Sequence, residues 1–158
     1  MRLRELRWGF LVVLAMHGLG CAAFRAASAR HEYIKGQTQE HVYNSPVQEV
    51  WSSARQMLFE KGYAVKDTGE AGAFAAETEW KQEGKSRSRY LLTGVRVDDA
   101  HSRVQFTRAV ETQRSGGWDN DGAERDLEIE FDLIERVEPG AASQINKEAD
   151  AKGEKASG

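Results

Sequence analysis

The sequence predicts an α+β fold, in which a curved antiparallel sheet of about 4–5 strands packs on one long helix and a C-terminal helix follows. Two observations support this fold class. Apolar residues recur at helical spacing in one segment, and apolar and polar residues alternate in the segments that follow it. These patterns cover residues 40–140 of a 158-residue chain. We therefore expect a single α+β domain over 40–140.

The long helix is predicted over Pro46–Lys61. Ser45 can cap its start, Pro46 suits the first turn and Gln48 completes a capping box. Gly62 is a typical residue to follow a helix end. One apolar stripe, which would face the sheet, comprises Val47, Val50, Trp51, Ala54, Met57 and Leu58.

The strands are predicted on both sides of this helix. A short strand over 40–44 precedes it, and Tyr63–Lys66, Ala73–Trp80, Arg87–Val97 and Arg103–Gln113 follow. Alternation places Trp80 on the same side as Phe74, Ala76 and Thr78. Apolar parity changes at Gly94, where a β-bulge would restore one buried face.

The remaining segments are predicted from composition and turn residues. Lys81–Ser86 and Arg114–Gly122 are expected to be loops. Residues 123–137 fit either a strand or a helix, and the many carboxylates favour the helix. Pro139 begins a short last helix that reaches Gln144-Ile145, within the terminal segment 141–158, whose remainder we expect to be disordered.

The first residues are typical of a secretory signal peptide. Residues 1–20 have a basic start, a short apolar stretch and a small-residue end. The following Cys21 completes Gly18-Leu19-Gly20-Cys21, which resembles a bacterial lipobox, so the resemblance implies that Cys21 carries acyl chains such as palmitate. Residues 21–39 would form a tether. Ala22 after the cysteine implies the outer membrane, with the domain facing the periplasm. The alternative is a soluble periplasmic or secreted protein cut after Ala27-Ser28-Ala29.

Charge and cysteine count narrow the class of protein. The formal net charge is −3, and removing residues 1–20 takes away three Arg and one Glu, which leaves −5. An acidic chain does not suit a nucleic-acid-binding protein. The single cysteine excludes an intramolecular disulfide, and lipidation would consume its thiol.

No residue pattern indicates catalysis, a metal or a cofactor. His31, His41 and His101 lack metal-ligand spacing and are interpreted as surface side chains. The acidic segment Gly117–Gly122 is interpreted as a helix-capping turn rather than a calcium loop. Four aromatic residues form the candidate binding surface, namely Trp51, Trp80, Tyr90 and Trp118.

Two other functions fit single features of the sequence. A small-ligand-binding domain would use a pocket between helix and sheet, lined by Trp51, Trp80 and Tyr90. A hydrolase would use Glu77, Glu79 or His101 for acid–base chemistry, although no recognisable catalytic constellation surrounds them.

A family resemblance covers about residues 40–113. The run Val42–Trp51 combines a strand with a capped helix carrying a Trp, Leu58–Tyr63 ends in Gly-Tyr, and Gly72–Trp80 contains Glu-Thr-Glu-Trp. This outline resembles the helix-grip domains of small outer-membrane lipoproteins of the BamC/NlpB-like kind. The resemblance implies a helix-grip fold and a non-enzymatic binding or accessory subunit, related to β-barrel assembly, with envelope proteins as partners. The oligomeric state is not predicted.

Overall fold

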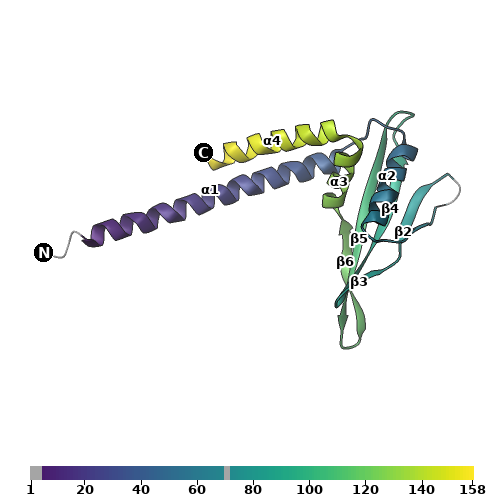
Figure 1. Ribbon diagram of the computed structural model, residues 1–158, viewed down its shortest axis with the longest axis horizontal. Helices are drawn as coiled ribbons and strands as arrows, with labels where there is room; N and C mark the ends of the chain where they lie inside the picture. The colour runs from purple at the N-terminus through teal and green to yellow at the C-terminus, as the bar shows by residue number, and fades with distance from the viewer. Residues whose placement is uncertain (1–4, 70–71) are drawn as a thin grey trace. The chain divides into compact units, whose positions relative to one another are not determined.

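The computed structural model describes residues 5–69 and 72–158, with side chains from Ala22 onward, and it has the predicted α+β fold (Figure 1). Two compact units are present. The sheet unit comprises Thr38–Ala142, and the helical unit comprises α1 up to Gln37 together with Ser143–Gly158. The helices are α1 (Glu5–Glu40), α2 (Val47–Glu60), α3 (Leu127–Val137) and α4 (Pro139–Ser157).

The sheet is antiparallel and has six strands in the described residues, rather than the predicted 4–5. Its order is β1-β2-β4-β5-β6, with β3 also paired to β4. The strands are β1 (Val65–Asp67), β2 (Phe74–Thr78), β3 (Lys81–Glu83), β4 (Ser86–Arg96), β5 (Ser102–Arg114) and β6 (Gly117–Arg125). The predicted strand over 40–44 is wrong, because α1 extends to Glu40 and only an isolated bridge joins Tyr43 to Ser102.

Helix α2 packs on one face of the sheet, against β4 and β5 (Figure 1). A Cβ atom at Gly94 of β4 would lie 2.8 Å from the Cβ of Phe74, 3.1 Å from Trp51 and 3.2 Å from Val47. At Gly94, helix and sheet therefore approach so closely that a Cβ atom would crowd its neighbours. The predicted bulge there is wrong, since β4 and β5 pair without interruption from Ser86 to Arg96.

The core lies between α2, α3 and this inner face of the sheet. Leu58, Leu92, Phe106 and Leu133 are at most 1% exposed. Tyr90 packs edge-to-face on Phe106 and on Tyr63, and its hydroxyl group donates to Asp126 at 2.8 Å. Tyr90 of β4 and Phe106 of β5 are at strand positions that alternation places on this inner face, and Tyr63 follows the end of α2.

The two ends of α2 differ from each other in how well the sequence predicts them. The predicted end is confirmed, because Gly62 has a φ of 83° and the amide of Tyr63 donates to the carbonyl of Leu58 at 3.0 Å. The predicted capping box is not formed. Pro46 occupies the cap position, and no side-chain hydrogen bond caps the helix. The carbonyl of Ser45 accepts from the Ser102 hydroxyl group, which joins the helix start to β5.

The predicted loop Arg114–Gly122 is mostly strand β6, which forms a hairpin with β5. Asp, Asn and Gly have poor strand propensity, so composition predicts a loop here. Cross-strand pairs override that propensity: Arg114 contacts Asp119 and Asp121, and Thr112 donates to Asp121 at 2.5 Å. A register shift between β5 and β6 lies here, between Val110 and Glu111, whereas the pairing of β4 with β5 is uninterrupted.

The segment 123–137, for which the sequence fits either a strand or a helix, contains the end of a strand and a helix. Residues 123–125 complete β6, and α3 begins at Leu127 with Asp126 as its cap, accepting from the amide of Ile129 at 3.2 Å. The interpretation of Gly117–Gly122 as a helix cap is therefore wrong. Asp126, directly before the first helical residue, performs that role.

The helical unit replaces the predicted tether and disordered tail. Residues 21–39 belong to α1, and α4 continues to Ser157. Small buried residues explain the difference, because Ala149 is fully buried and a Cβ atom at Gly153 would lie 3.1 Å from the carbonyl oxygen of Ala26. A small-residue stripe lets two helices approach closely, yet it contains few of the large apolar residues that indicate a buried face in a sequence. Arg30 pairs with Asp150 at 2.7 Å across the same contact.

The predicted signal peptide is described from residue 5 onward only as backbone of α1. Residues 1–4 are outside the described residues, and the side chain of Cys21 is also outside them. Among the described residues, no helix has both the length and the hydrophobicity that crossing a membrane requires.

We expect Gly94→Ala to lower the free energy of unfolding by about 1–3 kcal/mol, because the added methyl group overlaps Phe74 of β2 and crowds Trp51 and Val47 of α2. Denaturant unfolding of the purified chain measures this change. Gly116→Ala is the matched control, since nothing lies within 4 Å of a Cβ atom there. Equal losses in both variants would contradict the close-approach argument.

Candidate functional site

The face of the sheet opposite α2 carries the candidate site. Even-numbered residues of β4, such as Ser88, Tyr90 and Leu92, are buried on the α2 side. Their odd-numbered neighbours therefore point to the other side. We call this side the outer sheet face; on β4 it comprises Arg87, Arg89, Leu91, Thr93 and Val95.

Trp80 belongs to the outer sheet face because of a change of register. Glu77 of β2 pairs with Leu91, so an unbroken strand would pair residue 80 with Ser88. Ser88 pairs with Lys81 instead, which means that one extra residue lies between β2 and β3. The extra residue moves Trp80 to the side opposite Phe74. The prediction that both share a side is wrong for this reason.

Trp80, Arg87 and Trp118 form a stack on the outer sheet face, which we call the Trp–Arg stack. The guanidinium carbon of Arg87 lies 4.7 Å from the ring centroid of Trp80 and 4.4 Å from that of Trp118. Glu111 on β5 accepts from Arg87 Nε at 2.7 Å. Two rings and a carboxylate therefore hold one cation, in a part-buried setting where such contacts are stronger than in water.

Arg89 extends the stack but is less well paired. Its guanidinium carbon lies 4.9 Å from the Trp80 ring centroid, and its contact with Glu77 is 3.4 Å long. Its Nε is buried and has no hydrogen-bond partner among the described residues. The side chain is 35% exposed, so its outer nitrogens can reach a ligand at the surface.

The rest of the outer sheet face is partly apolar. Val95 is 58% exposed and Leu91 is 37% exposed, and the positions beside them on β5 carry Arg103 and Thr107. Exposed apolar side chains next to aromatic and arginine side chains are the composition of the central part of protein–protein interfaces.

The structure divides the predicted binding surface between two faces. Trp80 and Trp118 lie on the outer sheet face and share Arg87. Trp51 and Tyr90 are 8% and 6% exposed and lie in the core. Their predicted role in a surface or pocket is therefore wrong. Trp51 packs edge-to-face on Phe74 at 5.7 Å and beside Gly94, which leaves no space for a ligand at this point between α2 and the sheet.

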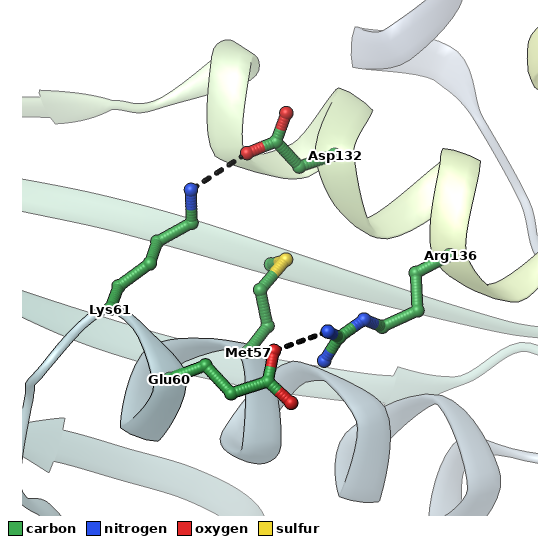
Figure 2. Close-up of a pocket in the computed structure, with 5 residues that line it drawn as sticks. All are labelled: Met57, Glu60, Lys61, Asp132 and Arg136. Carbon is green, nitrogen blue, oxygen red and sulfur yellow. Dashed lines mark hydrogen bonds and ion pairs between the residues drawn. The ribbon is translucent and has the colours of Figure 1, made fainter.

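A polar cleft of about 260 Å³ lies between α2 and α3 (Figure 2). Its charged lining residues already pair across it, since Lys61 contacts Asp132 at 2.9 Å and Glu60 contacts Arg136. The Arg136 guanidinium lowers the pKa of Glu60 below its ordinary value. Because each charge in the cleft has a partner, the cleft offers a ligand less than the outer sheet face does.

His41 is not the surface side chain that the sequence predicts. Its Nε2 lies 3.1 Å from Glu138 Oε2, and both side chains are 13% exposed. The two atoms are close enough for an ion pair but form no aligned hydrogen bond. Burial lowers the pKa of His41, and the Glu138 carboxylate opposes this only in part. Glu138 Oε1 accepts from the amide of Asn44 at 2.6 Å, so the pair joins the segment after α1 to the α3–α4 junction.

The other groups considered for chemistry have local partners. Glu77 contacts Arg89, and His101 contacts Asp98 at 2.8 Å within one turn. Backbone amides and His101 together lower the pKa of Asp98. In the described part of the chain, no group of three His, Cys, Asp or Glu residues could hold a metal ion.

Sequence reasoning missed the arginines of the site. Arg87 and Arg89 are two residues apart on a predicted strand, which places them on one face, and Trp80 lies in the preceding strand. This spacing could have indicated a cationic row. The missing information was the register that brings Trp80 and Trp118 to the same face.

No family model, curated protein or solved structure matches this chain.

We expect Arg87→Ala to lower the free energy of unfolding by about 1–2 kcal/mol and to open both indoles to solvent, because two ring contacts and an ion pair are lost together. Acrylamide quenching of tryptophan fluorescence should increase. Arg114→Ala is the control, since Arg114 pairs with carboxylates in the same hairpin but contacts no described ring. Unchanged quenching in Arg87→Ala would show that the stack does not shield its rings.

We expect stability to fall as the pH decreases below about 6.5, because the unfolded chain then protonates His41 while burial keeps the folded form neutral to lower pH. Denaturant midpoints measured between pH 8 and pH 5 test this. His41→Gln should flatten the change over this range, whereas replacing the exposed His31 with Gln should not. The same pH dependence in both variants would assign the effect to other groups.

Proposed function

We propose that this chain is a non-enzymatic lipoprotein of the bacterial cell envelope, anchored through Cys21, whose domain binds an envelope protein. The observation that carries the proposal is the Trp–Arg stack on the outer sheet face, the side that α2 leaves uncovered. Tryptophan and arginine are the residues that most often dominate the binding energy of protein interfaces. The exposed Leu91 and Val95 beside these residues add apolar area of the kind that the centre of a protein interface contains.

The anchoring part of the proposal rests on the sequence. A basic and apolar segment ends at the only cysteine of the chain, in the lipobox-like run Gly18–Cys21. Lipoprotein modification supplies more than one acyl chain, which is what stable attachment to a bilayer requires. Ala22 favours the outer membrane as the site of attachment, with the domain in the periplasm.

An accessory role in β-barrel assembly is the narrower form of the proposal. It rests on the resemblance of residues 40–113 to BamC/NlpB-like domains. The arrangement of α2 across one face of an antiparallel sheet is compatible with that resemblance, but many unrelated functions use such an arrangement. The outer sheet face is the more direct support for a binding role.

We expect the wild-type chain to fractionate with outer membranes and Cys21→Ala to be lost from them, because the thioether that carries the lipid cannot form. Immunoblots of separated membrane and soluble fractions measure this. Ser28→Ala is the control, since it leaves Cys21 intact and removes only a hydroxyl group. Outer-membrane retention of Cys21→Ala would refute the anchor.

The binding role is tested separately in the same cells. A photo-crosslinking residue at Gln105, on the outer sheet face, should join the chain to another envelope protein. The same residue at Gln48, on the exposed side of α2, should do so much less. Equal crosslinking from both positions would contradict binding through the outer sheet face.

A further inference from the structure

We propose that the outer sheet face binds an extended, carboxylate-rich segment of a partner protein that lies along β4 and β5. This inference rests on the proposed binding role and specifies the chemistry of the partner. Its basis is the distribution of paired and unpaired charge on that face.

The outer sheet face carries positive charge that its own carboxylates do not neutralise. Glu111 accepts two hydrogen bonds from Arg87, which occupies that pair. Glu77 makes only a long contact with Arg89. Lys66, which is opposite Glu77 on β1, and Arg103 of β5 form no ion pair among the described contacts. Arg89 and Lys66 therefore lie beside one weakly engaged carboxylate, and Arg103 has no ion-pair partner among the described contacts.

This local charge is opposite in sign to that of the whole chain. The formal net charge of the sequence is −3. A cationic face on an acidic protein orients an anionic partner toward that face and repels it from the rest of the surface. Charge complementarity thus selects an acidic occupant.

The geometry of the cations fits a strand-like segment. Arg89 lies beside Trp80 at one end, and Arg103, opposite Val95, lies near the other end of the β4–β5 pair. Six residues along a strand separate the Arg89 and Val95 positions, which is about 20 Å. An extended segment of about seven residues covers that length. Its alternate side chains would all face the sheet, so carboxylates near its two ends would meet the arginines and apolar side chains would lie between them.

The chemistry of the contacting groups favours carboxylates of a protein over other anions. Guanidinium groups bind carboxylates through two parallel hydrogen bonds, and the terminal nitrogens of Arg89, whose side chain is 35% exposed, can donate such a pair. Between the cations, Leu91 and Val95 are exposed and would cover apolar side chains of the same segment. A phosphate-rich polymer offers no apolar partner for these two residues.

The sheet edges do not provide an equivalent site. Strand β6 has a bulge at Asp121 and carries Asp119 and Glu124, and β1 has only three residues. Bulged, charged and short edge strands resist the addition of another strand. The partner is therefore expected on the face of the sheet and not at its edge.

Binding of a defined peptide to the purified full chain tests the proposal. The probe is a fluorescein-labelled ten-residue peptide of alternating threonine and glutamate, and its control replaces each glutamate with glutamine. Fluorescence anisotropy at low and at physiological ionic strength measures both affinities. We expect the glutamate peptide to bind and the glutamine peptide to bind at least about tenfold more weakly. Equal affinities would overturn the proposal.

Matched variants locate the site. Arg89→Gln combined with Arg103→Gln should weaken binding about tenfold. Arg55 and Arg114 lie away from the outer sheet face and pair with aspartates. Arg55→Gln combined with Arg114→Gln therefore removes the same charge elsewhere on the domain and should leave binding unchanged. Lys66→Gln combined with Arg103→Gln changes two side chains without described ion pairs. This variant should fold normally and bind several-fold more weakly than the wild type. Equal affinity of all variants would overturn the proposal.

Two outcomes separate this inference from the proposed function. Crosslinks from Gln105 in envelopes without binding of the glutamate peptide would leave the binding role in place and remove the acidic partner. Binding to vesicles that contain phosphatidylglycerol, abolished by the Arg89 and Arg103 changes, together with failure of the peptide, would assign the face to lipid and overturn the proposal.

Discussion

The close packing of α2 on the sheet at Gly94 is the constraint on which the rest of this domain depends. Phe74, Trp51 and Val47 surround this position so closely that a side chain would not fit. An amphipathic helix has one apolar stripe and can cover one face of a sheet. Because α2 occupies the inner face, every odd-numbered residue of β4 is left on the other side. The functional surface is thus defined by the packing of the opposite face.

The extra residue between β2 and β3 then completes that surface. It leaves the amide of Tyr90 without a ladder partner, and the Thr78 hydroxyl group accepts from that amide at 2.9 Å. The register with β1 continues on the other side of β2, because the amide of Glu79 donates to the carbonyl of Ala64 at 2.9 Å. A register change whose hydrogen bonds are satisfied costs little. Without it, Trp80 would point to the core side and Arg87 would have one ring partner instead of two.

A buried carboxylate fixes α3 at the other end of the sheet. Glu130 is 2% exposed; it accepts from the amide of Phe106 at 3.0 Å and from Arg125 at 2.9 Å. Burying a charge is unfavourable unless it is paired and hydrogen-bonded, as this one is. The Glu130 carboxylate therefore accepts from the backbone of β5 at the point where the pairing of β6 with β5 ends, and this hydrogen bond holds α3 against β5. Leu133 and Ile134 are then placed in the core.

Sequence patterns predict the elements that bury large apolar residues and miss those that do not. Helix α2 and strands β4 and β5 carry such residues at a clear period, and their positions are correct to within a few residues. Strand β6 is formed by Gly, Asp and Asn residues whose pairing only β5 explains, and α4 packs through Ala149 and Gly153. The side on which Trp80 lies depends on one inserted residue, which alternation within a single strand cannot detect.

The Trp–Arg stack suits recognition because its arginine is ordered before a partner binds. A long arginine side chain loses conformational entropy when a partner immobilises it, and this loss weakens binding. Arg87 is already held between two rings and a carboxylate, so the domain has ordered it during folding. Arg89 rests against one of these rings, and its side chain is 35% exposed, so its terminal nitrogens can donate to a partner. The stack therefore acts as a rigid base that orients Arg89, and the charge offered to a partner comes from the cations around it rather than from Arg87.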